Sequence, residues 1–126
     1  ANDPVSTLQI WKFILERFED NQSTCIFFNS RDDRPSRTRQ MIELSFKEIK
    51  PKKLIIRGNK LSKTIENFKM YSPETRIDTI SLEDNYNMIT SSFENLPSNT
   101  LIYAIGNQVG AGQEILQIIS EFKTSG

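Results

Sequence analysis

Apolar residues along the chain alternate between a spacing typical of helices and one typical of strands. Near the beginning they lie three and four residues apart, which favours an amphipathic helix; these residues are Leu8, Trp11, Ile14, Leu15 and Phe18. Asp3 and Pro4 precede them. Asp caps free backbone N–H groups, and Pro suits the first helical position. We therefore expect a helix that begins at Pro4 and ends near Asn21.

Four short apolar runs predict strands. Three of them are continuous, as in strands that are buried on both faces, and one alternates. The continuous runs are residues 25–28, 54–56 and 101–105, and the alternating run is residues 77–82. Helical spacing returns between these runs and after the last one. The predicted helices are residues 38–49, 61–68 and 86–96, and a final helix that carries Ile115, Ile118, Ile119 and Phe122.

The predicted order αβαβαβαβα indicates an α/β fold. Such alternation is typical of a three-layer αβα, Rossmann-like domain in which a mostly parallel sheet of four or five strands has helices on both faces. The 126 residues suffice for one domain, residues 1–126. Because the chain opens at a helix start, we expect a further strand before Ala1 in the natural protein. A sheet edge left open by its loss predicts self-association at high concentration.

The composition excludes several classes of function. Sixteen basic residues balance sixteen acidic ones, which argues against a general nucleic-acid-binding protein. Histidine is absent, so His-dependent nucleophilic catalysis and His-ligated metal sites are excluded. Cys25 is the only cysteine, so no internal disulfide forms, which is compatible with a reducing cytoplasm. Its apolar surroundings predict a buried core residue.

The loop at residues 29–37 follows the first predicted strand and carries unusual charge. Within it, residues 31–37 hold three arginines and two aspartates, including Asp32, Asp33, Arg34 and Arg37. Ligands of open α/β sheets bind at the carboxyl ends of the strands, and arginine binds carboxylate or phosphate through paired hydrogen bonds. The loop is therefore a candidate anion site. The alternative is a solvated turn whose aspartates pair with its own arginines.

A second candidate loop, residues 106–114, follows the last predicted strand. Gly110 and Gly112 allow the backbone to approach a ligand closely, and Glu114 places a carboxylate in the first turn of the final helix. The alternatives are a plain tight turn and a charge that stabilises the helix start. The complete dinucleotide fingerprint and the Gly-Lys-Ser/Thr of a Walker A loop are both missing, so we expect neither kind of nucleotide site.

Three segments together resemble motifs in the third domain of the Mur-type amide ligases. Residues 1–6 resemble an Ala-His-Asn-Pro-x-Ser opening, residues 32–35 an Asp-Asn-Pro-Arg loop, and residues 110–114 a Gly-x-Gly-His-Glu turn. Gln113 stands where the Mur ligases have histidine, and Arg34-Pro35 inverts the Mur order.

The resemblance is stronger to the ligase subunits of poly-γ-glutamate synthase, often called CapB or PgsB. These subunits share an Ala-Asn-Asp-Pro-x-Ser-Thr opening, an Asn-x-Arg-x-Asp-Arg-Pro-x-Arg loop and a Tyr-Ala-x-Gly-Asn-x-x-Gly segment. The matching positions are residues 1–7, 29–37 and 103–110, so the resemblance spans nearly the whole chain.

The resemblance implies a Mur-ligase C-terminal-domain-like fold. It also implies the C-terminal, substrate-binding domain of a larger ATP-dependent ligase that adds glutamate to poly-γ-glutamate in capsule biosynthesis. Such a ligase phosphorylates the carboxylate of the growing chain with MgATP, and the amino group of glutamate then attacks the acyl phosphate. ATP and Mg²⁺ would be bound mainly by a central domain that this chain lacks. The chain alone is thus expected to be inactive and to hold no cofactor.

The resemblance also implies roles for individual residues. Arg34 and Arg37 bind the carboxylates of glutamate, Glu114 orients the amine, and Asn2 and Asp3 lie near the nucleotide. The remaining substrate-site residues are Asp32, Asp33, Gly110 and Gly112. The implied partners are glutamate, the polymer and membrane-associated synthase subunits, at the cytoplasmic face of the membrane, with no nucleic acid and no metal in this domain.

The main alternative is a non-catalytic α/β binding or docking module for partner subunits. A receiver-like or Toprim-like regulatory module belongs to this class. A receiver would carry an acidic cluster after its first strand and a lysine after its last. Asp32 and Asp33 imitate the cluster, but no lysine follows the strand that ends at Ile105.

Overall fold

Four strands form one parallel sheet. The computed structural model describes residues 4–16, 23–30, 34–84, 86–97 and 100–106. The strand order is β3-β2-β1-β4, and every neighbouring pair is parallel. The strands are β1 (Ser23–Asn29), β2 (Lys53–Arg57), β3 (Arg76–Ile80) and β4 (Thr100–Gly106). The predicted parallel α/β sheet is therefore confirmed.

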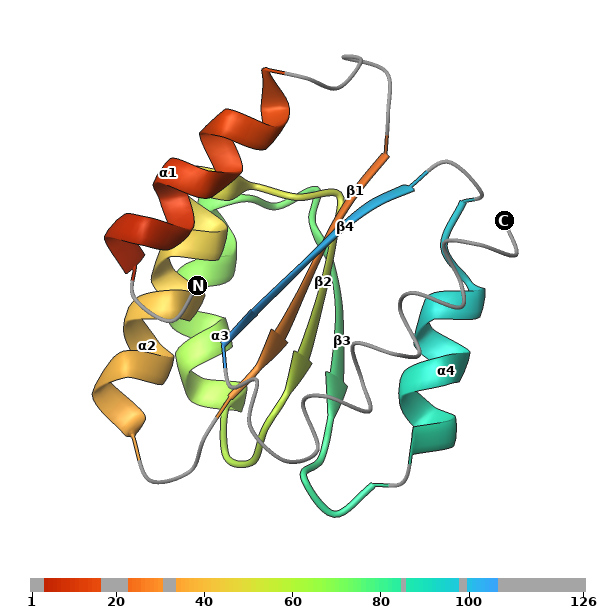
Figure 1. Cartoon of the computed structure of the whole chain (residues 1–126). Helices are drawn as coiled ribbons and strands as arrows, with labels where there is room; N and C mark the ends of the chain where they lie inside the picture. Colours follow the sequence, from red (N-terminus) through yellow and green to blue (C-terminus); the bar gives the residue numbers. More distant parts are fainter. Residues whose placement is uncertain (1–3, 17–22, 31–33, 85, 98–99, 107–126) are drawn as a thin grey trace.

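Helices cover both faces of this sheet, which confirms the three-layer prediction. Helices α1, α2 and α3 lie on one face, and α4 lies on the other (Figure 1). The α-helices within the described residues are α1 (Pro4–Leu15), α2 (Pro35–Leu44), α3 (Ser62–Phe68) and α4 (Tyr86–Glu94). A π-helical turn, η1 (Ser45–Ile49), continues α2, and a 3₁₀ turn, η2 (Lys69–Tyr71), continues α3. The predicted final helix lies outside the described residues, as do Phe18 and Asn21 of the first predicted helix.

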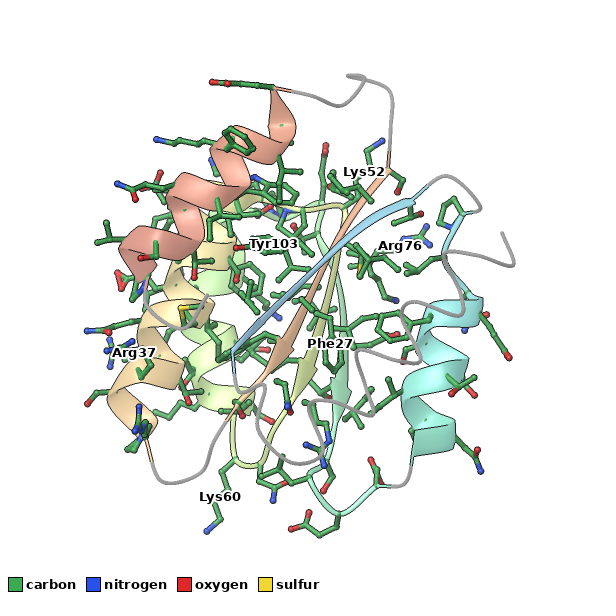
Figure 2. All side chains as sticks on the ribbon, viewed as in Figure 1. Phe27, Arg37, Lys52, Lys60, Arg76 and Tyr103 are labelled. Atoms are coloured by element: carbon green, nitrogen blue, oxygen red, sulfur yellow. The ribbon has the colours of Figure 1, made fainter. Side chains whose placement is uncertain are left out.

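The central strands β1 and β2 are apolar on both faces because both faces are covered. In β1, Ile26 and Phe28 pack in the core under α1, α2 and α3, whereas Cys25 and Phe27 pack in the core under α4. Figure 2 shows Phe27 between the sheet and α4. The continuous apolar runs follow from this double coverage, since alternate residues of a strand face opposite layers.

Several predicted boundaries differ from the structure. The first predicted helix ends at Leu15 instead of near Asn21, and most strand ends differ by one or two residues. Two further differences have a cause in the hydrogen bonds.

The third strand ends at Ile80 instead of residue 82, because Ser81 and Leu82 turn away from the sheet. The Ser81 N–H donates to Asp84 Oδ2 at 3.0 Å, and the Leu82 N–H donates to Asn59 Oδ1 at 3.1 Å. Side-chain acceptors therefore replace the next strand partners of this backbone.

The second difference lies in the helix predicted over residues 38–49. Its α-helical part begins earlier, at Pro35, and ends at Leu44, and the last turn is a π-helix. The Lys50 N–H donates to the Ser45 carbonyl at 2.8 Å, and Lys50 has a left-handed φ of 49°. Pro51 follows and cannot continue the helix, as the sequence indicates.

The strand register aligns the carboxyl ends of all four strands. Asn29 lies opposite Arg57 on one side and Gly106 on the other, and Arg57 lies opposite Ile80. The loops that leave the sheet at this edge therefore begin side by side. In an open parallel sheet this is the edge where ligands bind.

Candidate functional site

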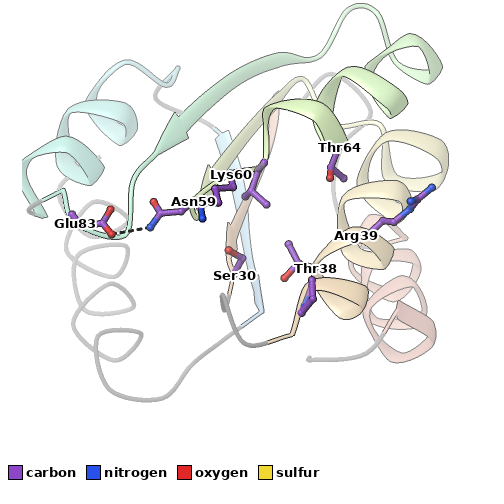
Figure 3. Close-up of a pocket in the computed structure, with 9 residues that line it drawn as sticks. Ser30, Thr38, Arg39, Asn59, Lys60, Thr64 and Glu83 are labelled. Atoms are coloured by element: carbon purple, nitrogen blue, oxygen red, sulfur yellow. Dashed lines mark hydrogen bonds between the residues drawn. The ribbon is translucent and has the colours of Figure 1, made fainter.

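A cleft of about 520 Å³ opens at the carboxyl edge of the sheet. It lies between the exits of β1, β2 and β3 and the beginnings of α2 and α3 (Figure 3). Its size is in the ordinary range for a small-molecule site. The lining residues come from five different segments: Ser30, Pro35, Thr38, Arg39, Asn59, Lys60, Leu61, Thr64 and Glu83.

Asn59 ties the exits of β2 and β3 together along one side of the cleft. Its Oδ1 accepts from the Leu82 N–H at 3.1 Å and lies 2.9 Å from Ser81 Oγ, whose single proton it shares with Glu83 Oε2. Its Nδ2 donates to Glu83 Oε1 at 2.8 Å. The amide oxygen is thus committed to the turn after β3, which fixes the amide nitrogen toward Glu83.

Glu83 is an exposed carboxylate in a fixed position. Hydrogen bonds from Ser81 Oγ and from Asn59 Nδ2 lower the pKa of Glu83, and the nearby charge of Arg57 lowers it further. The carboxylate is therefore ionised at neutral pH. Both of its oxygens already accept a hydrogen bond from the protein.

Lys60 lies at the rim of the cleft in an unusual backbone conformation. Its φ is 59°, a left-handed value that non-glycine residues adopt at a cost of about 1–2 kcal/mol. Its side chain is exposed, and Figure 2 shows it at the carboxyl edge, far from Lys52 at the opposite edge. Lys60 supplies a solvent-accessible positive charge to the cleft.

Arg57 connects the three strand exits beneath the cleft. Its carbonyl accepts from the Ser30 N–H and from Ser30 Oγ, each at 2.9 Å. Its Nη1 donates to Asn29 Oδ1 at 3.0 Å, and its Nη2 donates to the Leu82 carbonyl at 3.2 Å. One residue of β2 therefore holds the exits of both β1 and β3.

Helix α2 presents only one side to the cleft. Pro35, Thr38 and Arg39 are spaced so that they lie on one helical face, and all three line the cleft. Arg39 points away from the other lining residues in Figure 3, with its guanidinium 5.5 Å from the centre of the Phe68 ring. Arg37 lies about 200° around the helix from Pro35, and Figure 2 shows it on the outer side of α2.

The structure describes two of the residues that the resemblance selected. Arg34 is exposed and directly precedes Pro35 of the cleft, and its carbonyl accepts from the Thr38 N–H at 3.0 Å. Arg37 does not line the cleft. The substrate-binding role of each arginine stays a prediction. The other predicted site residues lie outside the described part of the chain: Asn2, Asp3, Asp32, Asp33, Gly110, Gly112 and Glu114.

Sequence reasoning missed Asn59, Lys60 and Glu83. Residues 59–96 contain no recognisable motif, but these three residues follow the second and third strands. The loop at residues 29–37 follows the first strand in the same way. The position of a residue directly after a strand is therefore the sequence signal that could have identified these three residues. Among the residues described, no three acidic, cysteine or histidine side chains are grouped so that they could hold a metal ion.

The family of the chain follows from comparison with known proteins. A model of the poly-gamma-glutamate synthase CapB C-terminal domain matches residues 1–122. The chain belongs to the CapB C-terminal domain family. Membership confirms the resemblance found in the sequence and places the domain in a poly-γ-glutamate synthase family.

Two curated relatives agree with membership of the CapB C-terminal domain family. PGA synthase CapB of Bacillus subtilis (strain 168) is 31% identical over 98% of this chain and 31% of its own length. Capsule biosynthesis protein CapB of Bacillus anthracis is 29% identical over 96% of this chain and 26% of its own length. This CapB-type chain therefore spans about a third or less of these relatives. No solved structure matches it.

None of the helices within the described ranges is long and apolar enough to cross a membrane.

Proposed function

We propose that this chain is the amino-acid-binding domain of an ATP-dependent amide ligase that extends poly-γ-glutamate with glutamate. One observation carries the proposal: a CapB-family C-terminal domain has a cleft of about 520 Å³, lined mainly by polar and charged residues, at the carboxyl edge of its sheet. The incoming glutamate would occupy this cleft. A Mur-type acid–amino-acid ligase joins a carboxylate and an amine, so its substrate site must hold an amine in a defined position.

The charges around the cleft suit a free amino acid that carries two carboxylates. Lys60 at the rim and Arg34, next to Pro35, supply positive charges on two sides. The ammonium group needs a carboxylate, and we assign this contact to Glu114, as the resemblance implies.

The proposed reaction divides between this domain and the rest of the synthase. ATP and Mg²⁺ would be held mainly by a domain that the chain does not include, with Asn2 and Asp3 near the nucleotide. Attack of the glutamate amine on the acyl phosphate forms the C–N bond, breaks the C–O bond to phosphate and releases one proton from the amine. This domain contributes positioning alone, which can supply several kcal/mol of the barrier. We further propose that partner subunits hold the complex at the cytoplasmic face of the membrane.

Lys60→Ala in the complete synthase tests the proposal, with glutamate-dependent ADP release as the assay. A lost charge-assisted contact is worth roughly 1.5–3 kcal/mol, so the KM for glutamate should rise about ten- to hundred-fold. Arg34→Ala and Glu114→Gln should act in the same direction. The KM for ATP should stay nearly unchanged in all three variants.

Lys52→Ala is the matched control, because Lys52 is an exposed lysine at the opposite edge of the sheet (Figure 2). A wild-type KM for glutamate in the Lys60, Arg34 and Glu114 variants would contradict the proposal. If the chain were instead a docking module for partner subunits, the three variants would keep the wild-type KM for glutamate, and the partner subunits would be lost on purification.

A further inference from the structure

Arg57 holds an unusual position among the charged residues of the described sheet. It is half-buried at the end of a central strand, and its side chain donates to both neighbouring exits, at Asn29 and Leu82. Its carbonyl accepts both hydrogen bonds that fix Ser30. The two neighbouring exits carry Ser30 and Glu83 of the cleft. The arrangement makes the relative position of these loops depend on one side chain.

The charge of Arg57 is not neutralised by an ion pair within the described ranges. The ion pairs there join Lys47 with Glu43, Lys53 with Asp78, and Lys69 with Glu66. The Nε of Arg57 is buried and has no hydrogen-bond partner among the residues that the structure describes. A half-buried cation with an unused donor is unfavourable for folding unless another interaction compensates for it. Arg57 thus places a positive charge at the carboxyl edge of the sheet, beside the exits that line the cleft, and this charge is close enough to lower the pKa of Glu83.

We propose that Arg57 is a positioning residue of the cleft, which fixes the exits of β1 and β3 and attracts a ligand carboxylate through its positive charge. The inference rests on the proposed function, because the carboxylate belongs to the incoming glutamate. Arg57 does not itself line the cleft. It acts through the loops that its hydrogen bonds hold and through the electrostatic attraction of its positive charge. Arginine suits this task because its planar fork reaches two acceptors at once, which a lysine cannot reproduce.

A positioning role of Arg57 and a purely structural role differ in their effect on glutamate binding. A residue that only stabilised the fold would reduce the amount of active enzyme and leave the KM for glutamate unchanged. A positioning residue changes the KM for glutamate. The electrostatic part also weakens with salt, but less than for an exposed charge, because Arg57 is half-buried and partly buried charges are screened less. Lys60 and Arg34 also contribute to the salt dependence of the KM, so the difference between the wild type and a variant without the Arg57 charge measures the contribution of Arg57.

The experiment compares Arg57→Met, Arg57→Lys and the control Arg76→Met in the complete synthase. Arg76 is an exposed arginine at the opposite edge of the sheet (Figure 2). We expect Arg57→Met to raise the KM for glutamate about tenfold or more and to flatten its salt dependence. Arg57→Lys should raise the KM less and retain the salt dependence, because it keeps the charge and loses the fork. Arg76→Met should match the wild type in both measurements.

Wild-type KM and salt dependence in Arg57→Met would overturn the inference. If Arg57→Met does not fold, Arg57→Lys decides: a wild-type KM would show that the bridge between the two exits is not needed. Lys60→Ala distinguishes this failure from that of the proposed function. An unchanged KM in Lys60→Ala removes the cleft as the glutamate site, whereas a raised KM there with a wild-type KM in the Arg57 variants removes only the role of Arg57.

Discussion

Cys25 lies on the sheet face under α4 and has no exposed surface. Burial raises the pKa of its thiol from 9.0 to about 12, and Lys53 opposes this shift only in part. Since the thiolate is the reactive form, Cys25 should be inert in the folded protein. The sequence prediction of a buried core cysteine is thus confirmed.

The raised pKa predicts a loss of stability in alkali. The folded state keeps the thiol proton above pH 9 and the unfolded state releases it, so the stabilising contribution is complete below pH 9. It is lost as pH rises from 9 toward about 12, at roughly 1.4 kcal/mol per pH unit at most. Urea unfolding of Cys25→Ala should show a shallower alkaline decline than the wild type. Equal declines in the two proteins would show that Cys25 does not contribute.

Tyr103 and Trp11 form the aromatic contact between β4 and α1. Their rings stack with centroids 5.8 Å apart and an interplanar angle of 9°. The Tyr103 hydroxyl is buried and has no hydrogen-bond partner in the described part of the chain, and burial raises the pKa of Tyr103. The ring therefore stabilises the contact, whereas the hydroxyl opposes it.

Tyr103→Phe should consequently be neutral or stabilising, because it removes an unsatisfied hydroxyl and keeps the ring. Tyr103→Ala should destabilise by about 2–4 kcal/mol through the lost packing. Thermal unfolding of the two variants measures the difference. A loss above about 1 kcal/mol in Tyr103→Phe would mean that the hydroxyl has a partner after all.

At the scale of elements, the close pairing of β1 and β4 depends on Gly106. Its φ is 95°, and an added Cβ would lie 2.3 Å from the Asn29 carbonyl oxygen. The position therefore excludes a side chain for two independent reasons, an unfavourable φ and a backbone clash.

Gly106→Ala and Gly106→Asn separate these two reasons. Asn tolerates positive φ better than Ala, so a φ effect alone would leave Gly106→Asn clearly the more stable of the two. The clash with Asn29 predicts instead that both variants are destabilised by about 1–3 kcal/mol or more in urea unfolding. A near-wild-type Gly106→Asn would contradict the close approach.

The sequence predicted the elements well where one physical signal, such as the apolar run of a strand covered on both faces, dominated. The strands β1 and β2 are recognisable as continuous apolar runs because both faces are covered. The end of β3 was misplaced because Asn59, more than twenty residues earlier, accepts the Leu82 N–H. Such a contact between distant segments leaves no local pattern in the sequence.

The candidate site was predictable only in part for the same reason. The arginine-rich loop was conspicuous because its charges are contiguous in the sequence. Asn59, Lys60 and Glu83 are unremarkable in their own segments, and the parallel register brings them to one cleft. Position at the end of a strand predicts such residues, but their convergence requires the strand order.

At the scale of the whole molecule, the parallel sheet separates two edges with different chemistry. The carboxyl edge carries Lys60, Glu83 and Arg57 around a cleft. The opposite edge carries Lys52 and Arg76 as exposed side chains (Figure 2). A ligand that binds in the cleft should therefore perturb the residues of the carboxyl edge and leave those of the opposite edge unchanged, although both edges carry positive charge.

The most direct test of the central claim is an NMR titration of the ¹⁵N-labelled chain with glutamate. Binding in the cleft predicts saturable shifts of the backbone amides of Ser30, Asn59, Lys60 and Thr64. The amides of Lys52 and Arg76 should stay unchanged, and Lys60→Ala should weaken the titration about tenfold or more. Shifts confined to the Lys52 edge, or a Lys60→Ala titration identical to the wild type, would contradict the assignment of the cleft as the glutamate site.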